Sequence, residues 1–272
     1  MSLRAEWVQF RDGDKKYQLY TSRLENAKTP LPVVIVIQEI WGTDAHILEL
    51  TDRFAKAGYL AVAPDLYAED GQRPAELKED RIEQVKDFLN TLPPTVWHDP
   101  NARYAELKKL PERKREDIQS TFETLFGGLA RMDQYLEILK ATFQFLQNYE
   151  YSRGQKVAST GYCMGGALSA MLAGVEPRLA GAVVYYGNLP QKEQLQGIQC
   201  PVLGFFGGLD ERITSQVPGF AEAMKEAGKS FTYEIYEGAH HAFFNDTRTS
   251  YHVDAARDAW AKTLRFFKEV LA

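Results

Sequence analysis

The sequence predicts an α/β fold with a mostly parallel central sheet and helices on both faces of that sheet. Short, apolar, β-branched segments alternate along the chain with amphipathic helical segments, which is typical of this class. The chain has 272 residues, of which 44% are hydrophobic and 25% charged. This length and composition are those of a globular protein that buries a sizeable core.

The predicted elements follow one another as strand and helix. Residues 32–38 are continuous, apolar and β-branched, as expected of a strand buried on both faces. A helical pattern over 45–57 ends at Gly58, and residues 60–63 predict the next strand. Further strands are predicted at 156–160, 180–186, 201–206 and 231–236, and further helices at 132–146, 218–227 and 254–270.

A charged segment at about 69–123 interrupts this alternation. It contains helical pieces separated by prolines, and it has too few apolar residues for a core of its own. We therefore expect residues 1–272 to form a single domain with a helical insertion, or partial lid, at about 69–123.

Composition also limits the partners of the chain. The formal net charge is −5 and no basic block stands out, so we expect no nucleic-acid partner. The longest apolar stretch, 33–37, is far too short to span a membrane, and the first ten residues do not resemble a secretory signal. Two cysteines, Cys163 and Cys200, exclude a disulfide framework and a four-cysteine metal site. These features favour a cytoplasmic protein.

The most informative motif is Gly161-Tyr162-Cys163-Met164-Gly165-Gly166, which follows a predicted strand and opens a helix. This is the nucleophile elbow of an α/β-hydrolase, with cysteine in place of serine. Glycines two residues before and after the nucleophile avoid collisions in a strained turn, and the helix N-terminus stabilises a thiolate or an oxyanion. The alternative, a buried structural thiol, suits Cys200 better, because that residue lies at a strand start.

The remaining members of a catalytic triad should follow the nucleophile in the order acid, then histidine. Asp210 follows the predicted strand 201–206 and is the expected acid, with Glu211 as the alternative. His240 and His241 follow the last predicted strand, and one of them should be the catalytic histidine. The oxyanion hole should use the backbone N–H of Met164 and that of Ile40, in the loop after the first predicted buried strand.

Several motifs together resemble the dienelactone hydrolase family over most of the chain from residue 32 to 270, apart from the insertion. The matching segments are Gln38-Glu39-Ile40-Trp41-Gly42, Ala63-Pro64-Asp65-Leu66-Tyr67, the elbow at Cys163, Tyr185-Tyr186-Gly187, Gly207-Gly208-Leu209-Asp210 and Ala239-His240-His241-Ala242-Phe243. The resemblance implies a carboxylic ester hydrolase similar to carboxymethylenebutenolidase, with neither a metal nor an organic cofactor.

The resemblance also assigns roles to individual residues. The family has Gly-His where this chain has His240-His241, so His241 is the expected catalytic histidine. A glutamate at the position of Glu39 contacts the resting nucleophile in the family. We expect its carboxylate to disfavour the thiolate and to keep Cys163 protonated until substrate arrives. The alternative is that Glu39 only braces its loop by hydrogen bonding.

Substrate binding is where the chain departs from the family. The dienelactone enzyme binds its substrate carboxylate with two arginines. One corresponds loosely to Arg115, whereas the other falls at Asn245, where Arg248 from the same loop is a candidate replacement. The alternative for both arginines is a solvated surface charge. Trp41 should line the pocket, as could Trp97 or Tyr104, although these aromatic residues could instead belong to the core.

We therefore expect a hydrolase that cleaves a small ester or lactone through a cysteine acyl-enzyme. Cys163, Asp210 and His241 form the predicted triad, and Glu39 assists it. Two alternatives remain at this stage: a ligand-binding protein that has lost the chemistry of its scaffold, and a thioesterase or peptidase with the same triad. The protein is expected to be a monomer or a small homo-oligomer.

Overall fold

The structure is a computed structural model that describes residues 2–93, 96 and 99–272. It divides into two compact units. The larger unit runs up to Leu66 and continues from Asp133 to Ala272, and the smaller unit comprises Tyr67–Met132.

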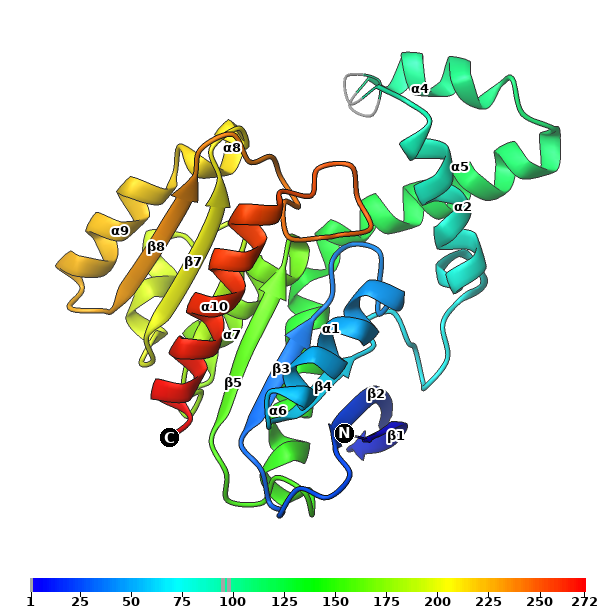
Figure 1. Cartoon of the computed structure of the whole chain (residues 1–272). Helices are drawn as coiled ribbons and strands as arrows, with labels where there is room; N and C mark the ends of the chain where they lie inside the picture. Colours follow the sequence, from blue (N-terminus) through cyan, green and yellow to red (C-terminus); the bar gives the residue numbers. More distant parts are fainter. Residues whose placement is uncertain (1, 94–95, 97–98) are drawn as a thin grey trace. The chain divides into compact units, whose positions relative to one another are not determined.

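The larger unit is built on a sheet for which the described residues supply eight strands, in the order β1-β2-β4-β3-β5-β6-β7-β8 (Figure 1). The strands are β1 (Leu3–Asp12), β2 (Lys15–Leu24), β3 (Val33–Ile37), β4 (Leu60–Pro64), β5 (Val157–Tyr162), β6 (Ala182–Tyr185), β7 (Val202–Gly207) and β8 (Phe231–Tyr236). β2 pairs antiparallel with β1 and β4, and all other pairs are parallel. The predicted mostly parallel sheet is therefore confirmed.

The hairpin of β1 and β2 is absent from the elements that the sequence analysis predicts. Most side chains of β1 are exposed, so this strand lacks the apolar run that identifies a buried strand. Its anchor to the core is Phe10, which packs against Tyr17 and stacks on Phe145 at 4.5 Å between ring centroids.

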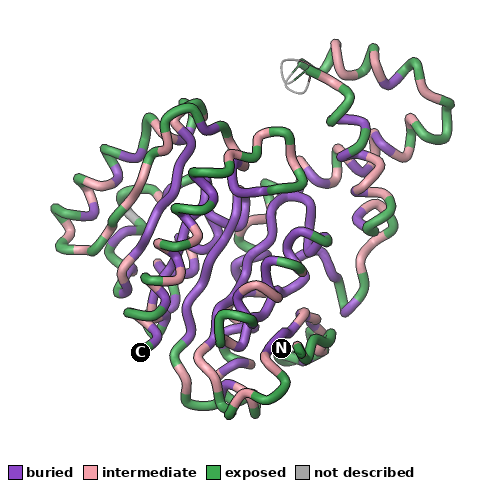
Figure 2. The backbone as a smooth tube through the Cα atoms, in the orientation of Figure 1, coloured by how far each residue is buried: buried purple, intermediate pink, exposed green. Residues whose placement is uncertain are grey.

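Helices cover both faces of the sheet, as predicted (Figure 1). They are α1 (Ala45–Lys56), α6 (Met132–Asn148), α7 (Met164–Val175), α9 (Val217–Glu226) and α10 (Val253–Val270), with the short α8 (Glu211–Thr214) and the 3₁₀ turn η3 (Lys192–Gly197). On the face nearer the viewer, Phe54 of α1 packs against Trp260 and Phe267 of α10, at 4.7 and 5.7 Å between ring centroids. Buried residues concentrate along the central strands and on the sides of the helices that cover them (Figure 2).

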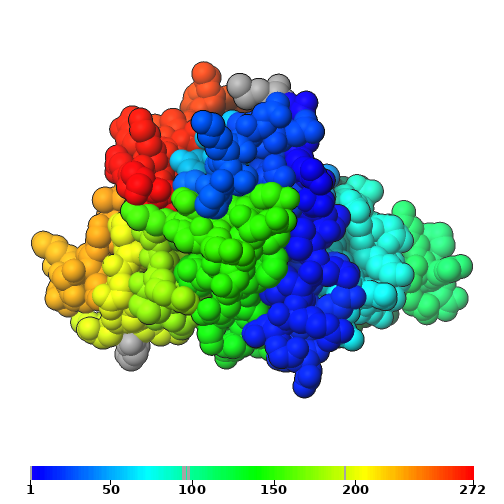
Figure 3. Space-filling view, turned by 90° about the horizontal axis from the view of Figure 1, so that it is seen from below, coloured from blue at the N-terminus to red at the C-terminus, as the bar shows by residue number. Residues whose placement is uncertain are grey.

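The register of the parallel strands brings their carboxyl ends to one edge of the sheet. Ile37 pairs with Gly161, Tyr162 with Tyr185, and Gly207 with Tyr236, so the loops that follow these strands lie together. The C-terminal end of α10 lies at the opposite end of the sheet and is seen in red in the view from below (Figure 3). In parallel sheets, ligands bind at the carboxyl ends of the strands.

The smaller unit consists of helices. They are η1 (Ala75–Leu77), α2 (Glu79–Asn90), α4 (Pro100–Leu107), α5 (Glu112–Gly127) and η2 (Gly128–Arg131). Arg81 of α2 ties this helix to α5 through an ion pair with Asp117 at 2.9 Å and a hydrogen bond to Ser120 at 2.8 Å. The unit extends past the expected insertion of about 69–123, and its buried residues include Ile82, Val85, Ile118 and Leu125.

Candidate active site

Cys163 occupies the turn between β5 and α7. Its backbone has a φ of 55°, which is uncommon for a non-glycine residue and indicates a strained turn. A Cβ atom on Gly161 would lie 1.8 Å from the carbonyl oxygen of Gly165, and one on Gly165 would lie 2.3 Å from that of Ile37. Only glycine fits at either position, so the elbow can form with this spacing and hold Cys163 half-buried at the start of α7.

His241 and Asp210 come together at the same edge of the sheet. The Nδ1 atom of His241 lies 2.6 Å from Oδ2 of Asp210, and the Asp210 side chain is 10% exposed. The backbone N–H of Leu209 donates to the carbonyl of Ala239 at 2.9 Å, which fixes the turn after β7 against the loop after β8. The structure thus pairs His241 with Asp210, while His240 and Glu211 are exposed.

His241 also interacts with Cys163. Burial of the imidazole opposes its protonation, but the charge of Cys163 and hydrogen bonding to Asp210 and Cys163 outweigh burial and raise the pKa of His241 to about 10. A protonated imidazole is the form that stabilises a neighbouring thiolate. Cys200 has a different environment: it is 7% exposed, and burial raises the pKa of its thiol to about 11.

Glu39 lies at the start of the tight turn after β3, where the N–H of Gly42 donates to its carbonyl at 3.2 Å. Its side chain is 2% exposed, and both carboxylate oxygens accept hydrogen bonds. Tyr186 donates to Oε1 at 3.0 Å and Asn245 donates to Oε2 at 2.8 Å. The described residues thus show these two donors on Glu39, where we expected the thiol of Cys163.

The two amides predicted for the oxyanion hole belong to loops at this same edge. Met164 is the first residue of α7, directly after Cys163, and Ile40 lies in the turn that Glu39 begins. Both side chains are buried, at 4% and 6% exposure, so the chain enters each turn with a fixed backbone.

The residues predicted to bind substrate divide between the two units. Trp41 is buried, and the guanidinium of Arg248 lies over its ring at 5.2 Å from the centroid. Arg115 belongs to α5 in the smaller unit, where it lies 3.8 Å from the carboxylate of Glu112. Tyr104 belongs to α4 in that unit, with Lys108 over its ring, and Trp97 lies outside the described residues.

Sequence reasoning missed Tyr186 and Asn245 as site residues. In the sequence, Tyr186 is only part of the motif Tyr185-Tyr186-Gly187. Asn245 stands out only because the family has an arginine at that position. Tyr186 packs the edge of its ring against His241 at 5.2 Å between centroids, and like Cys163 it has a positive φ, of 40°. No pattern in the sequence indicates that the hydroxyl of Tyr186 and the amide of Asn245 both donate hydrogen bonds to Glu39.

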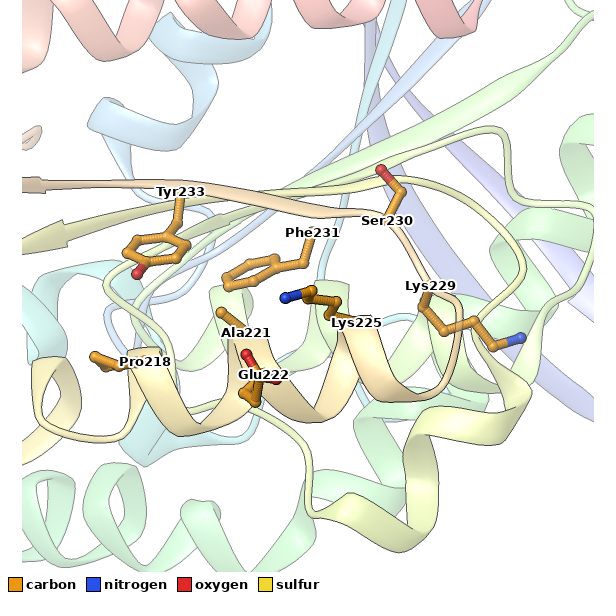
Figure 4. A pocket seen from close by; sticks show the side chains of 8 residues that line it. All are labelled: Pro218, Ala221, Glu222, Lys225, Lys229, Ser230, Phe231 and Tyr233. Carbon is orange, nitrogen blue, oxygen red and sulfur yellow. The ribbon is translucent and has the colours of Figure 1, made fainter.

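A cavity of about 490 Å³ lies elsewhere, between α9 and β8 (Figure 4). Its walls include Phe231 and Tyr233 of the strand and Lys225 of the helix. None of the residues that line it belongs to the Cys163, Asp210 and His241 group.

In the described part of the chain, neither a helix able to cross a membrane nor a cluster of three metal-ligating side chains is found.

Comparison with known proteins identifies the family of the chain. The model of the dienelactone hydrolase family matches residues 19–271. A protein of Saccharolobus solfataricus, provisionally named a carboxymethylenebutenolidase, is 35% identical over 266 residues, which cover 96% of this chain and 97% of that protein. Protein usf of Aquifex pyrophilus is 32% identical, with coverage of 98% and 99%.

Solved structures show the same similarity. A protein of Klebsiella pneumoniae, provisionally named a dienelactone hydrolase, is 28% identical with a TM-score of 0.66, and the match covers 98% of this chain and 99% of that one. The dienelactone hydrolase of Anabaena variabilis shares the fold, with a TM-score of 0.65 at 14% identity. The predicted fold and enzyme class are thereby confirmed, and the chain belongs to the dienelactone hydrolase family, with an α/β-hydrolase fold.

Proposed function

We propose that this hydrolase cleaves small esters or lactones through an acyl-enzyme on Cys163. The observation that carries the proposal is the interaction of His241 with both Cys163 and Asp210 beside a strained elbow. A thiolate is a strong nucleophile, and a neighbouring imidazolium is the group that maintains it at neutral pH.

In the first step the Cys163 thiolate attacks the ester carbonyl and forms a carbon–sulfur bond. The resulting oxyanion is stabilised by the backbone N–H groups of Ile40 and Met164. The intermediate collapses when the carbon–oxygen bond to the leaving group breaks, and the imidazolium of His241 gives its proton to the departing oxygen. A thioester on Cys163 and a neutral imidazole remain.

In the second step the charge on Cys163 is absent, because the sulfur is acylated. Burial lowers the pKa of His241 while that charge raises it, so acylation itself shifts His241 toward its neutral form. The imidazole then takes a proton from water, which attacks the thioester and releases the acid and the thiolate. Asp210 orients the ring and stabilises the imidazolium that forms again.

Trp41 and Arg248 provide one wall of the proposed substrate site. The guanidinium of Arg248 lies over the ring of Trp41, 5.2 Å from its centroid, and Trp41 directly follows Ile40. We propose that Arg248 binds a carboxylate of the substrate. Arg115, in the smaller unit, stays a prediction from the sequence. We place the reaction in the cytoplasm, in keeping with the two free cysteines.

The test is hydrolysis of a panel of chromogenic aryl esters, lactones and thioesters by purified protein and two cysteine variants. Cys163→Ala should lose at least about three powers of ten in kcat/KM, because it removes the attacking atom. Cys200→Ala, the matched control, should retain nearly all activity. Activity that survives Cys163→Ala at more than a few per cent would contradict the proposal. The substrate group that is cleaved fastest separates an esterase from a thioesterase.

A further inference from the structure

The buried carboxylate of Glu39 is held by two neutral side chains from different parts of the chain. Tyr186, directly after β6, donates to Oε1, and Asn245, in the loop between β8 and α10, donates to Oε2. Two donors on opposite oxygens fix a buried carboxylate in one orientation. The arrangement of these donors therefore controls where the carboxylate of Glu39 lies.

The orientation of the Asn245 amide is fixed by Thr247. The oxygen of the amide accepts from the backbone N–H of Thr247 at 3.0 Å and from its hydroxyl at 2.7 Å. A backbone N–H can only donate, so the amide oxygen must face Thr247 and the amide NH₂ must face Glu39. Asn245 is fully buried, and reversing its amide would leave unpaired polar groups in the interior.

Asn245 thus joins three parts of the proposed active site. It lies in the same loop as His241, and its N–H donates to the carbonyl of Ala242 at 3.0 Å. Its amide holds Glu39, the residue that begins the turn containing Ile40. The third part is Tyr186, whose ring contacts His241 and whose phenol is electrostatically coupled to both Glu39 and Cys163.

We propose that Asn245 is a positioning residue: with Tyr186 it holds the carboxylate of Glu39 away from Cys163, so that the sulfur pairs with His241. The same hydrogen bond fixes the turn that offers the Ile40 amide. This proposal rests on the proposed function for its kinetic consequence, but its effect on the thiol can be measured without substrate.

The first experiment measures the rate at which iodoacetamide alkylates Cys163 between pH 5 and 9 in the full-length protein, without substrate. In Asn245→Ala, Oε2 of Glu39 loses its donor and the carboxylate can accept a hydrogen bond from the thiol. The thiolate fraction should then fall, and alkylation near pH 7 should slow about fivefold or more. Other ionisable groups of this region include Tyr162, Tyr186, His241, Asp210 and Arg248, which are the same in both proteins.

Asp246→Asn is the matched control, because Asp246 anchors the same loop without contacting Glu39. Its carboxylate pairs with Arg53 at 2.8 Å and with His46 at 3.2 Å, both on α1. Loosening this anchor should lower thermal stability and leave the alkylation profile unchanged. Equal slowing in both variants would show that Asn245 acts only as a loop anchor, and an unchanged rate in Asn245→Ala would overturn the proposal.

The second experiment uses Asn245→Asp, which keeps the shape and removes the donor. The new carboxylate repels Glu39 unless one of the two is protonated, so kcat for a neutral ester should fall about tenfold to a hundredfold at pH 8. The ratio of variant to wild-type kcat should recover as pH falls toward 5, while KM changes little. A ratio that stays flat with pH would contradict the positioning role.

Thr247→Val provides a variant that should fold whatever happens at Asn245, because Thr247 is exposed. It removes one of the two groups that fix the amide, so a smaller effect of about twofold to fivefold is expected in both experiments. If neither experiment shows an effect of Thr247→Val, the result counts against the proposal.

The outcome for the proposed function is separate from the outcome for Asn245. If wild-type protein shows no Cys163-dependent hydrolysis, the proposed function fails, whereas the alkylation experiment still decides the role of Asn245.

Discussion

At the scale of single residues, the site is a chain of polar contacts rather than an isolated triad. Asp210 holds His241, His241 interacts with Cys163, and Tyr186 contacts both the histidine ring and Glu39. All five of these side chains are ionisable, so the charge of each depends on its neighbours. A substitution at any one of them should therefore change the pH dependence of the reaction as well as its rate.

The arginines provide a residue-scale prediction about substrate class. If Arg248 binds a carboxylate, Arg248→Gln should raise KM for an ester that carries an acid group by about tenfold to a hundredfold, from the loss of a charge-assisted hydrogen bond. A neutral ester of the same size should be affected little. For Arg115 of the smaller unit, Arg115→Gln is tested in the same way, by comparing KM for the acidic and the neutral ester. Equal changes for both substrates would eliminate the carboxylate clamp and indicate a packing role over Trp41.

At the scale of elements, the strand–turn–helix unit of β5, the elbow and α7 sets the position of Cys163, the proposed nucleophile. The unit depends on close approach of backbones, because Gly165 packs directly against the carbonyl groups at the end of β3. Glycine at this position is thus required by the packing of β3 against α7, in addition to the turn itself.

Two glycines of α7 test this requirement. Gly165→Ala would place a Cβ atom 2.3 Å from Ile37 O and 2.4 Å from Gln38 O, so the free energy of unfolding should fall by about 3 kcal/mol or more. Gly174→Ala is the control in the same helix: its nearest neighbour would be Gln194 O at 3.5 Å, an ordinary contact. It should be neutral or stabilising by up to about 1 kcal/mol. Urea denaturation measures both, and similar values would refute the packing account.

The same elements show what could be predicted from the sequence. β3 to β8 and the helices between them carry periodic apolar patterns, and the elbow, Asp210 and His241 follow strands in a fixed order. The β1–β2 hairpin has no such signal, because most of β1 is exposed. The contacts of Asn245 and Tyr186 with Glu39 depend on how three separate loops meet, which local patterns do not encode.

At the scale of the whole molecule, the family match spans residues 19–271 and thus includes the smaller unit Tyr67–Met132. We propose on this basis that the smaller unit is an insertion within one hydrolase domain rather than an independent second domain. The prolines and charged residues of this unit interrupt the alternation of strands and helices, which is why the insertion could be predicted from the sequence. Its internal contacts, such as those of Arg81, give it more structure than we expected.

The central claim is that an acyl group is transferred to Cys163 during turnover. The most direct measurement is mass spectrometry of protein quenched in acid within the first turnovers of a chromogenic ester, followed by peptide mapping. We predict a mass increase of one acyl group, located on the peptide that contains Cys163, formed at the rate of the initial burst and absent in Cys163→Ala. A burst of product without a protein adduct, or an adduct on Cys200 or another residue, would contradict the account.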